Sequence, residues 1–449
     1  MVVFVASSVF AGMVTTSGML LTARAAQAVG AAMIMPSTLS TVNAVFRGKH
    51  RAMAFGIWGA VISGAAAIGP LAGGALTQWA SWRWIFFVNL PIGVLLVVAA
   101  LMVVPETHGD RRPGFDYLGF LLSATGLGTL VFAIIEGPEY GWWQQVGQLS
   151  FFGVAWPSSF ALSAIPFALL VSVVNLTVFV WWELRRLHHG QTAVMDLRLF
   201  ALPTFSWGNL TAAMVAVGEF ALLFVLPLFL INALGLSVMQ AGVILAAMAA
   251  GSFASGGMAR HVAGRLGSPG TVILGLALEL TSVLALSLVV GPETPGWVLA
   301  IPLVFYGLGL GLASAQLTGT VLRDVPVGQS GQGSAAQSTV RQVGSALGTA
   351  IAGGALAMTL SHSLPNALAR GGFTGPEADQ LAEVTRLSAG SNLAGLRADA
   401  SAEGVRLLGA LVDGLAEATR AAMMTSSAFL LIGLAGSIAV FRVASRTRE

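Results

Sequence analysis

The sequence predicts an all-α protein that crosses a lipid bilayer many times. Hydrophobic residues make up 56% of the 449 residues and charged residues only 9%, whereas soluble domains carry roughly 25% charged residues. Apolar runs of roughly 20 residues, the length that spans a bilayer, recur along the chain. Arginine and lysine gather in alternate connections between these runs, which is the charge asymmetry of membrane proteins.

Twelve apolar segments follow one another. The first six lie at 1–14, 18–45, 53–78, 84–104, 115–136 and 160–182. The second six lie at 204–231, 238–258, 269–291, 296–322, 331–359 and 420–443. Segment 1–14 is short for a full span, and the other eleven are long enough to cross.

The basic residues orient these segments. If the N-terminus is cytoplasmic, the connections on that side hold 14 of the 22 arginines and lysines, while the short outer connections hold only Arg83. The long connection 360–419 then lies outside, and long loops are exempt from the positive-inside rule. We therefore expect both termini to be cytoplasmic.

Several function classes are excluded. The chain has no cysteine, which removes disulfides, thiolate catalysis and cysteine-bound metals. Its six histidines do not stand at metal-ligand spacing within a span, so we expect no metal and no cofactor. It has no Walker A, G-x-S-x-G or H-E-x-x-H run, so we expect neither nucleotide binding nor an enzyme. No basic patch is interleaved with aromatic residues, so we expect no nucleic-acid partner.

The stretch Ile62–Leu76 is apolar but largely lacks side chains on one face, because Gly64, Gly69, Gly73 and Gly74 recur along it, and it also contains Pro70. Small residues at this spacing let another helix backbone approach closely. The proline removes a backbone donor and bends the helix. Such a stretch suits a place where two bundles move past each other. Ordinary static packing of membrane helices is the alternative.

A repeat predicts the division into domains. Ala72–Leu76 recurs as Ala352–Leu356, an offset of 280 residues, and similarly oriented repeats imply two parallel halves. The segments 115–136 and 160–182 have no partner in this register. We therefore expect an N-terminal bundle at 1–104 with four of six spans, a two-helix insert with linkers at 105–190, and a six-span bundle at 191–449.

Charged residues within spans are the candidates for chemistry. An arginine at mid-helix costs about 2.5–3.5 kcal/mol on insertion scales and marks ion or proton paths. Arg24 is such a residue, and Gln27 shares its face. Glu219 is the best acidic candidate, because a buried carboxylate can exchange a proton. The alternatives are a buried Arg24 satisfied by carbonyl groups, and a Glu219 that pairs with an arginine or lies near the outer mouth.

Five further polar residues are weaker candidates for a substrate cavity: Asn209, Glu279, Gln316, Gln337 and Arg341. The three amides suit a cavity or hydrogen bonds between helices equally well. Glu279 has no polar neighbour on its predicted face. Arg341 lies near the cytoplasmic edge, where we expect its side chain to reach toward the headgroups.

These motifs resemble the major facilitator superfamily, and within it the fourteen-span drug:proton antiporters. Leu20-x-x-x-Arg24-x-x-Gln27-x-x-Gly30 resembles the fourth-span motif, and Gly64-x-x-x-x-Gly69-Pro70-x-x-Gly73-Gly74 resembles the antiporter motif. Further similar runs are Trp82–Gly93, Phe115–Gly119 and Arg341–Gly348. The resemblance implies proton-coupled efflux of lipophilic or cationic compounds by alternating access, in a bacterial inner membrane, with Arg24 in the proton path.

The chain departs from this family at its start. Family members carry two more spans, and a basic Gly-Asp-Arg loop, before the segment in which this chain begins. The resemblance therefore predicts that the first two spans are missing and that these 449 residues alone do not transport. The alternative function is a truncated, non-transporting membrane remnant or a partner subunit.

The orientation can be tested by cysteine labelling, because the chain has no native cysteine. A Ser391→Cys variant should react with a membrane-impermeant maleimide in intact cells, since this residue lies in the predicted outer connection. Reaction only after permeabilisation would contradict the predicted orientation.

Overall fold

The computed structural model describes residues 1–449 except 47, 105–115, 152–153, 158, 398–400 and 447–449. The side chains of some other residues, most of them between 40 and 71, are likewise not described. A helix covers each of the twelve predicted segments, which confirms the all-α fold. In the described part, ten helical stretches are long and apolar enough to cross a bilayer. The first helix has only 12 residues, as the short first segment predicts.

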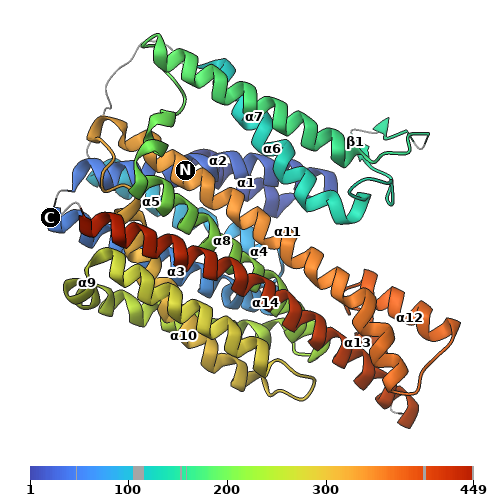
Figure 1. The fold of residues 1–449 in the computed structure, drawn as a ribbon. Coiled ribbons are helices and arrows are strands. Elements are labelled where there is room, and N and C mark those ends of the chain that lie inside the picture. The colour runs from blue at the N-terminus through green and yellow to red at the C-terminus, as the bar shows by residue number, and fades with distance from the viewer. Residues whose placement is uncertain (47, 105–115, 152–153, 158, 398–400, 447–449) are drawn as a thin grey trace. The chain divides into compact units, whose positions relative to one another are not determined.

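The chain forms two compact units, and each combines an early and a late segment of the sequence. The first unit comprises Met1–Asp110 and Leu230–Ser338. Its helices are α1 (Val2–Met13), α2 (Ser17–Val45), α3 (Gly48–Trp79), α4 (Trp84–Phe87), α5 (Asn89–Val103), α9 (Val238–Val289) and α10 (Gly296–Val321), with the short turns η2 (Phe229–Ala233) and η3 (Val327–Gln329) (Figure 1).

The second unit comprises Arg111–Phe229 and Thr339–Glu449. It contains α6 (Tyr117–Tyr140), α7 (Ala164–His188), η1 (Leu197–Ala201), α8 (Pro203–Leu228), α12 (Pro376–Leu387), α13 (Leu393–Leu396), α14 (Ala402–Arg446) and most of α11 (Ser330–Arg370). A small hairpin of β1 (Ser150–Phe151) and β2 (Val154–Ala155) lies between α6 and α7, which pack on each other. The division at 1–104, 105–190 and 191–449 stays a prediction.

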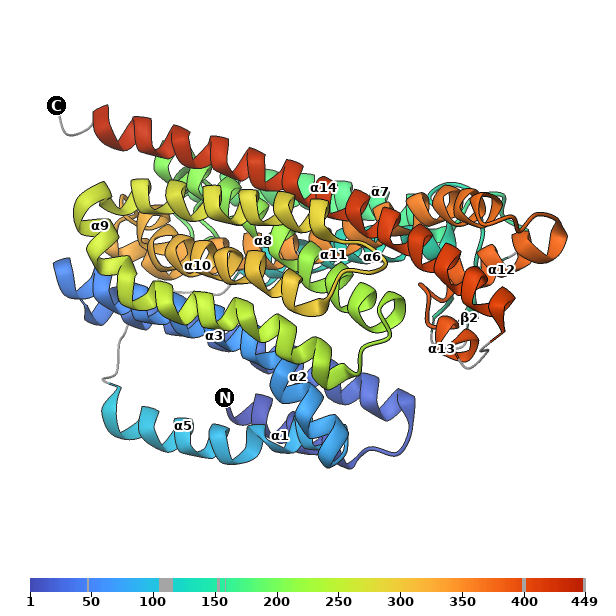
Figure 2. The ribbon, with the colours of Figure 1, turned by 90° about the horizontal axis from the view of Figure 1, so that it is seen from below.

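Helix α9 contains the two predicted spans 238–258 and 269–291. Gly267 has a φ of 71°, a conformation that favours glycine, and the chain reverses direction there (Figure 2). Both halves pack on α10 through glycines. A Cβ atom at Gly309 would lie 2.8 Å from the backbone nitrogen of Glu279, and Gly251 meets the carbonyl of Val304.

Helices α11 and α14 are longer than predicted. They have 41 and 45 residues, so each is about 60 Å long or more at 1.5 Å per residue. A bilayer core is about 30 Å thick. The connection 360–419 is therefore largely helical, and both helices continue beyond the predicted ends of the spans at 359 and 420. Ser363 Oγ donates to the carbonyl of Gly414 at 2.9 Å, which joins the two extensions.

The glycine-rich stretch lies in α3, which packs on α9 and α10. A Cβ atom at the buried Gly74 would lie 3.2 Å from the carbonyl oxygen of Val238 at the start of α9. At Gly69 and Gly73 a Cβ atom would meet no described atom within 4 Å. Among the described residues the expected close approach occurs at Gly74, and at Gly69 and Gly73 it stays a prediction. The surroundings of the Gly64 and Pro70 side chains are outside the described part.

This difference predicts unequal effects of two matched substitutions. Gly74→Leu should lower the thermal unfolding midpoint in detergent, because overpacking costs about 1–3 kcal/mol. Gly73→Leu should stay near the wild type, because its side chain has room. Equal loss of stability in both variants would contradict the arrangement of α3 against α9.

Candidate functional site

A chain of polar side chains links α1, α2 and the start of α5. Arg24 Nη1 donates to Gln27 Oε1 at 2.7 Å, and Gln27 Nε2 donates to Ser8 Oγ at 2.7 Å. Asn89 Nδ2 donates to the same Ser8 oxygen at 3.4 Å. Gly30 makes this possible, since a Cβ atom there would lie 2.6 Å from the backbone nitrogen of Phe4. The close approach brings α1 against the face of α2 that carries Gln27.

The arrangement assigns different surroundings to the two predicted residues. Gln27 is buried, while Arg24 is exposed and its guanidinium carbon lies 5.8 Å from the centre of the Phe86 ring. This distance is within the range of a cation–π contact. Arg24 is therefore held by an amide side chain, and the alternative of a buried arginine satisfied by carbonyl groups is wrong.

The second site brings together Glu219 and Arg341, which the sequence analysis treated as separate candidates. Arg341 Nη2 on α11 lies 3.6 Å from Glu219 Oε2 on α8, and both side chains are largely buried. A Cβ atom at Gly344 would lie 2.6 Å from the carbonyl oxygen of Ala213, so α11 and α8 touch backbone to backbone. The alternative of an arginine-paired glutamate holds for Glu219. The expectation that Arg341 reaches toward the headgroups is wrong.

Two of the remaining cavity candidates make local hydrogen bonds. Asn209 Nδ2 donates to the carbonyl of Phe205 within its own helix at 2.9 Å, and Gln337 Nε2 donates to Thr318 Oγ1 at 3.3 Å. Gln316 is buried, and Glu279 is fully buried beside Gly309. These contacts favour hydrogen bonding within and between helices. A role in substrate binding stays a prediction.

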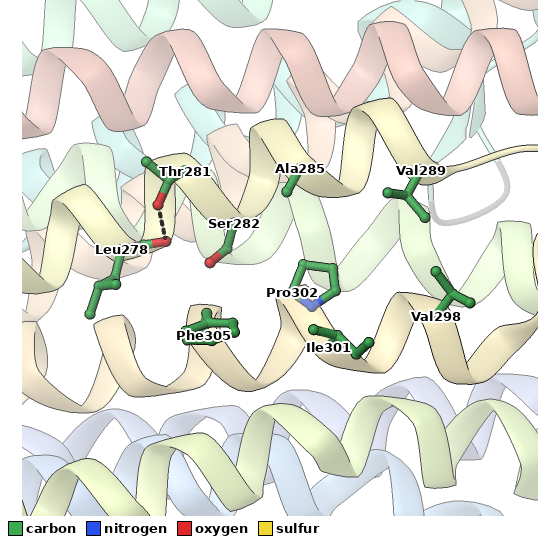
Figure 3. A pocket seen from close by; sticks show the side chains of 9 residues that line it. All are labelled: Leu278, Thr281, Ser282, Ala285, Val289, Val298, Ile301, Pro302 and Phe305. Atoms are coloured by element: carbon green, nitrogen blue, oxygen red, sulfur yellow. Dashed lines mark hydrogen bonds between the residues drawn. The ribbon is translucent and has the colours of Figure 1, made fainter.

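An apolar groove of about 440 Å³ lies between the second half of α9 and α10. Leu278, Ile301 and Phe305 form much of its wall (Figure 3). The Ser282 hydroxyl points toward this space and has no hydrogen-bond partner among the described residues. The groove can therefore accept an apolar surface that carries one hydrogen-bonding group.

The chain matches a protein family along most of its length. Residues 1–116 and 116–349 match the Major Facilitator Superfamily. The chain belongs to this family. The motifs at Arg24 and Gly64 both lie within the matched residues.

Related proteins have names that refer to transport and resistance. The chain is 30% identical to an uncharacterized transporter of this superfamily, Rv1250 of Mycobacterium tuberculosis, over 86% of this chain and 62% of the relative. It is 30% identical to the multidrug resistance protein Stp of the same species, over 82% and 64%. The methylenomycin A resistance protein of Bacillus subtilis is 29% identical, over 78% and 71%. The chain thus spans less than two thirds of the length of the first two relatives.

One solved structure is similar along 98% of this chain and 80% of its own. It is a bacterial homologue of the human lysosomal transporter Spinster in an inward-facing, occupied conformation. The TM-score is 0.49 and the sequence identity is 20%.

The polar chain around Arg24 predicts the effect of substitutions there. In cells that express the protein from its own gene, Arg24→Ala should abolish proton-coupled efflux while leaving expression largely intact. Arg24→Lys should retain some activity at best, because an ammonium group does not reproduce the planar contact with Gln27. Normal efflux by Arg24→Ala, measured with a fluorescent lipophilic cation, would contradict a role in the proton path.

Proposed function

We propose that the protein exports small lipophilic or cationic compounds in exchange for protons, as a member of the fourteen-span drug:proton antiporters. The motifs at 20–30 and 64–74 support this assignment. So do the names of the relatives, which include a multidrug resistance protein, a lincomycin resistance protein and a tetracenomycin C resistance and export protein. The bilayer, protons and the exported compound are then its partners.

The ion pair between Glu219 and Arg341 is the observation that carries the proposal. The burial of both groups makes their charges dependent on each other, since loss of one partner from a buried pair costs about 3–5 kcal/mol. A proton that arrives on Glu219 removes the charge that faces Arg341. Protonation would then weaken the contact between α8 and α11 at Gly344, which gives proton binding a means to move two helices.

Two other features support proton transfer and substrate binding in this proposal. The chain from Arg24 through Gln27 and Ser8 to Asn89 offers a hydrogen-bonded route across three helices. The apolar groove beside Phe305 suits the lipophilic part of a substrate. Both termini lie in the cytoplasm in this proposal, and the protein resides in the bacterial inner membrane.

Glu219→Gln provides the test, because glutamine has nearly the same shape and cannot release a proton. Protein expressed from its own gene, together with any coding sequence upstream of Met1, and purified into vesicles should show uptake of a lipophilic cation dye that depends on a pH gradient, together with counterflow of protons. Glu219→Gln should lose the proton flux, with at least a tenfold lower initial rate. Glu417→Gln is the matched control, because Glu417 is exposed and pairs only with Arg370 among the described residues.

The outcomes separate the two candidate functions. Proton-coupled uptake by the wild type that Glu219→Gln removes supports the antiporter. Coupled uptake that survives in Glu219→Gln would contradict the role of the ion pair. Folded wild-type protein without substrate-dependent proton flux would support the non-transporting remnant or partner subunit.

A further inference from the structure

A second cluster of charged residues lies where α7 ends beside the start of α6. Asp116 caps α6 by accepting from the backbone N–H of Gly119 at 2.9 Å. It also accepts from Trp182 Nε1 at 3.0 Å and lies 3.1 Å from Arg186 Nε. Asp116 is buried, and its charge is balanced by the arginine. These contacts stabilise an ionised carboxylate at this position.

Glu183 stands next to Trp182 on α7 and lacks such a balance. Its side chain has 0% exposure. It accepts from the backbone N–H groups of Val194, at 3.2 Å, and Met195. Its other oxygen, Oε2, has no hydrogen-bond partner among the described residues. The two backbone donors favour the ionised carboxylate, whereas its complete burial and the unpartnered Oε2 favour uptake of a proton.

The charged neighbours do not neutralise Glu183. Arg186 faces Asp116 and also donates to the carbonyl of Thr192 at 2.7 Å. In the connection that follows, Asp196 pairs with Arg198 at 2.8 Å. The described charges that face Glu183 are thus Asp116 and Arg186, one negative and one positive. Because the charges of Asp116 and Arg186 balance each other, an ionised Glu183 would leave a net negative charge among these described groups.

Gly119 brings the two carboxylates together. A Cβ atom at this residue would lie 2.6 Å from Glu183 Oε1 and 2.7 Å from Asp116 Oδ2. Two carboxylates that approach one point repel each other when both are ionised, and this favours protonation of one. Asp116 pairs with Arg186 and accepts the N-cap hydrogen bond from Gly119, so protonation of Glu183 is favoured over protonation of Asp116.

We propose that Glu183 is a proton-binding site within the α6–α7 pair. It takes a proton from water when the backbone of residues 194–195 closes over it, and it returns the proton to water when that backbone moves away. The connection from α7 to η1 thereby becomes sensitive to protonation. This site is separate from Glu219 and does not depend on the proposed transport.

Infrared spectroscopy of the purified full chain tests the proposal directly. The wild type at neutral pH should show the C=O stretch of a protonated carboxyl group, with a shift in heavy water. The difference spectrum between the wild type and Glu183→Gln should contain this band, and the difference spectrum for the control Glu417→Gln should not. An unchanged band in Glu183→Gln would overturn the proposal. Glu183 would then be an ionised carboxylate that only holds the backbone of residues 194–195 by hydrogen bonds.

A second variant keeps the test decisive if Glu183→Gln does not fold. Asp116→Asn removes the negative neighbour and frees Arg186 to face Glu183. Both changes favour the ionised carboxylate, so the band should disappear at a lower pH than in the wild type. A band that titrates as in the wild type, in folded Asp116→Asn protein, would overturn the proposal. Neither readout requires transport, so failure here is distinguishable from failure of the antiporter proposal.

Discussion

The close approach of helix backbones at small residues is the constraint on which the rest of the structure depends. Within a bilayer, lipid tails are as apolar as leucine, so helices associate through tight packing and hydrogen bonds. Gly30 lets α1 reach α2, and Gly344 lets α11 reach α8. Each contact also brings polar side chains together: Gln27 with Ser8, and Glu219 with Arg341. The packing positions and the candidate functional groups are therefore set by the same residues.

The sequence alone predicts which segments form helices, but it does not predict all the residues at which these helices begin and end. Apolar runs predict helices because backbone groups in lipid must bond within their own segment. The reversal near Gly267 was also predictable, since it separates two apolar runs. The extension of α11 beyond residue 359 was not, because the helix continues past the apolar residues through a mixed polar pattern. The start of α14 before residue 420 was predictable, because apolar residues from Val405 to Leu415 recur at helical spacing. In these two extensions, Leu364 and Gly414 pack on each other across the connection between the helices.

Some residues of the candidate site could likewise be predicted from the sequence and others could not. Arg24 and Gln27 were predictable as a pair, because residues three apart on one helix are neighbours. Ser8 and Asn89 were missed, because they come from other helices and their spacing in the sequence carries no information on contact. Glu183 was missed for a different reason: a charged residue beside two arginines at the end of a span resembles a solvated edge. Only the position of residues 194–195 over its side chain shows that it is buried.

The length of α11 and α14 has a mechanical consequence. The hydrogen bond from Ser363 to Gly414 joins the two extensions, so we expect them to tilt together. Displacement at the end of a rigid rod grows with distance from its pivot. A small tilt of these helices near Glu219 would therefore produce a larger displacement at α12. A fluorophore or spin label on α12 would report the motions of unit 2 with more amplitude than any label placed within the bilayer.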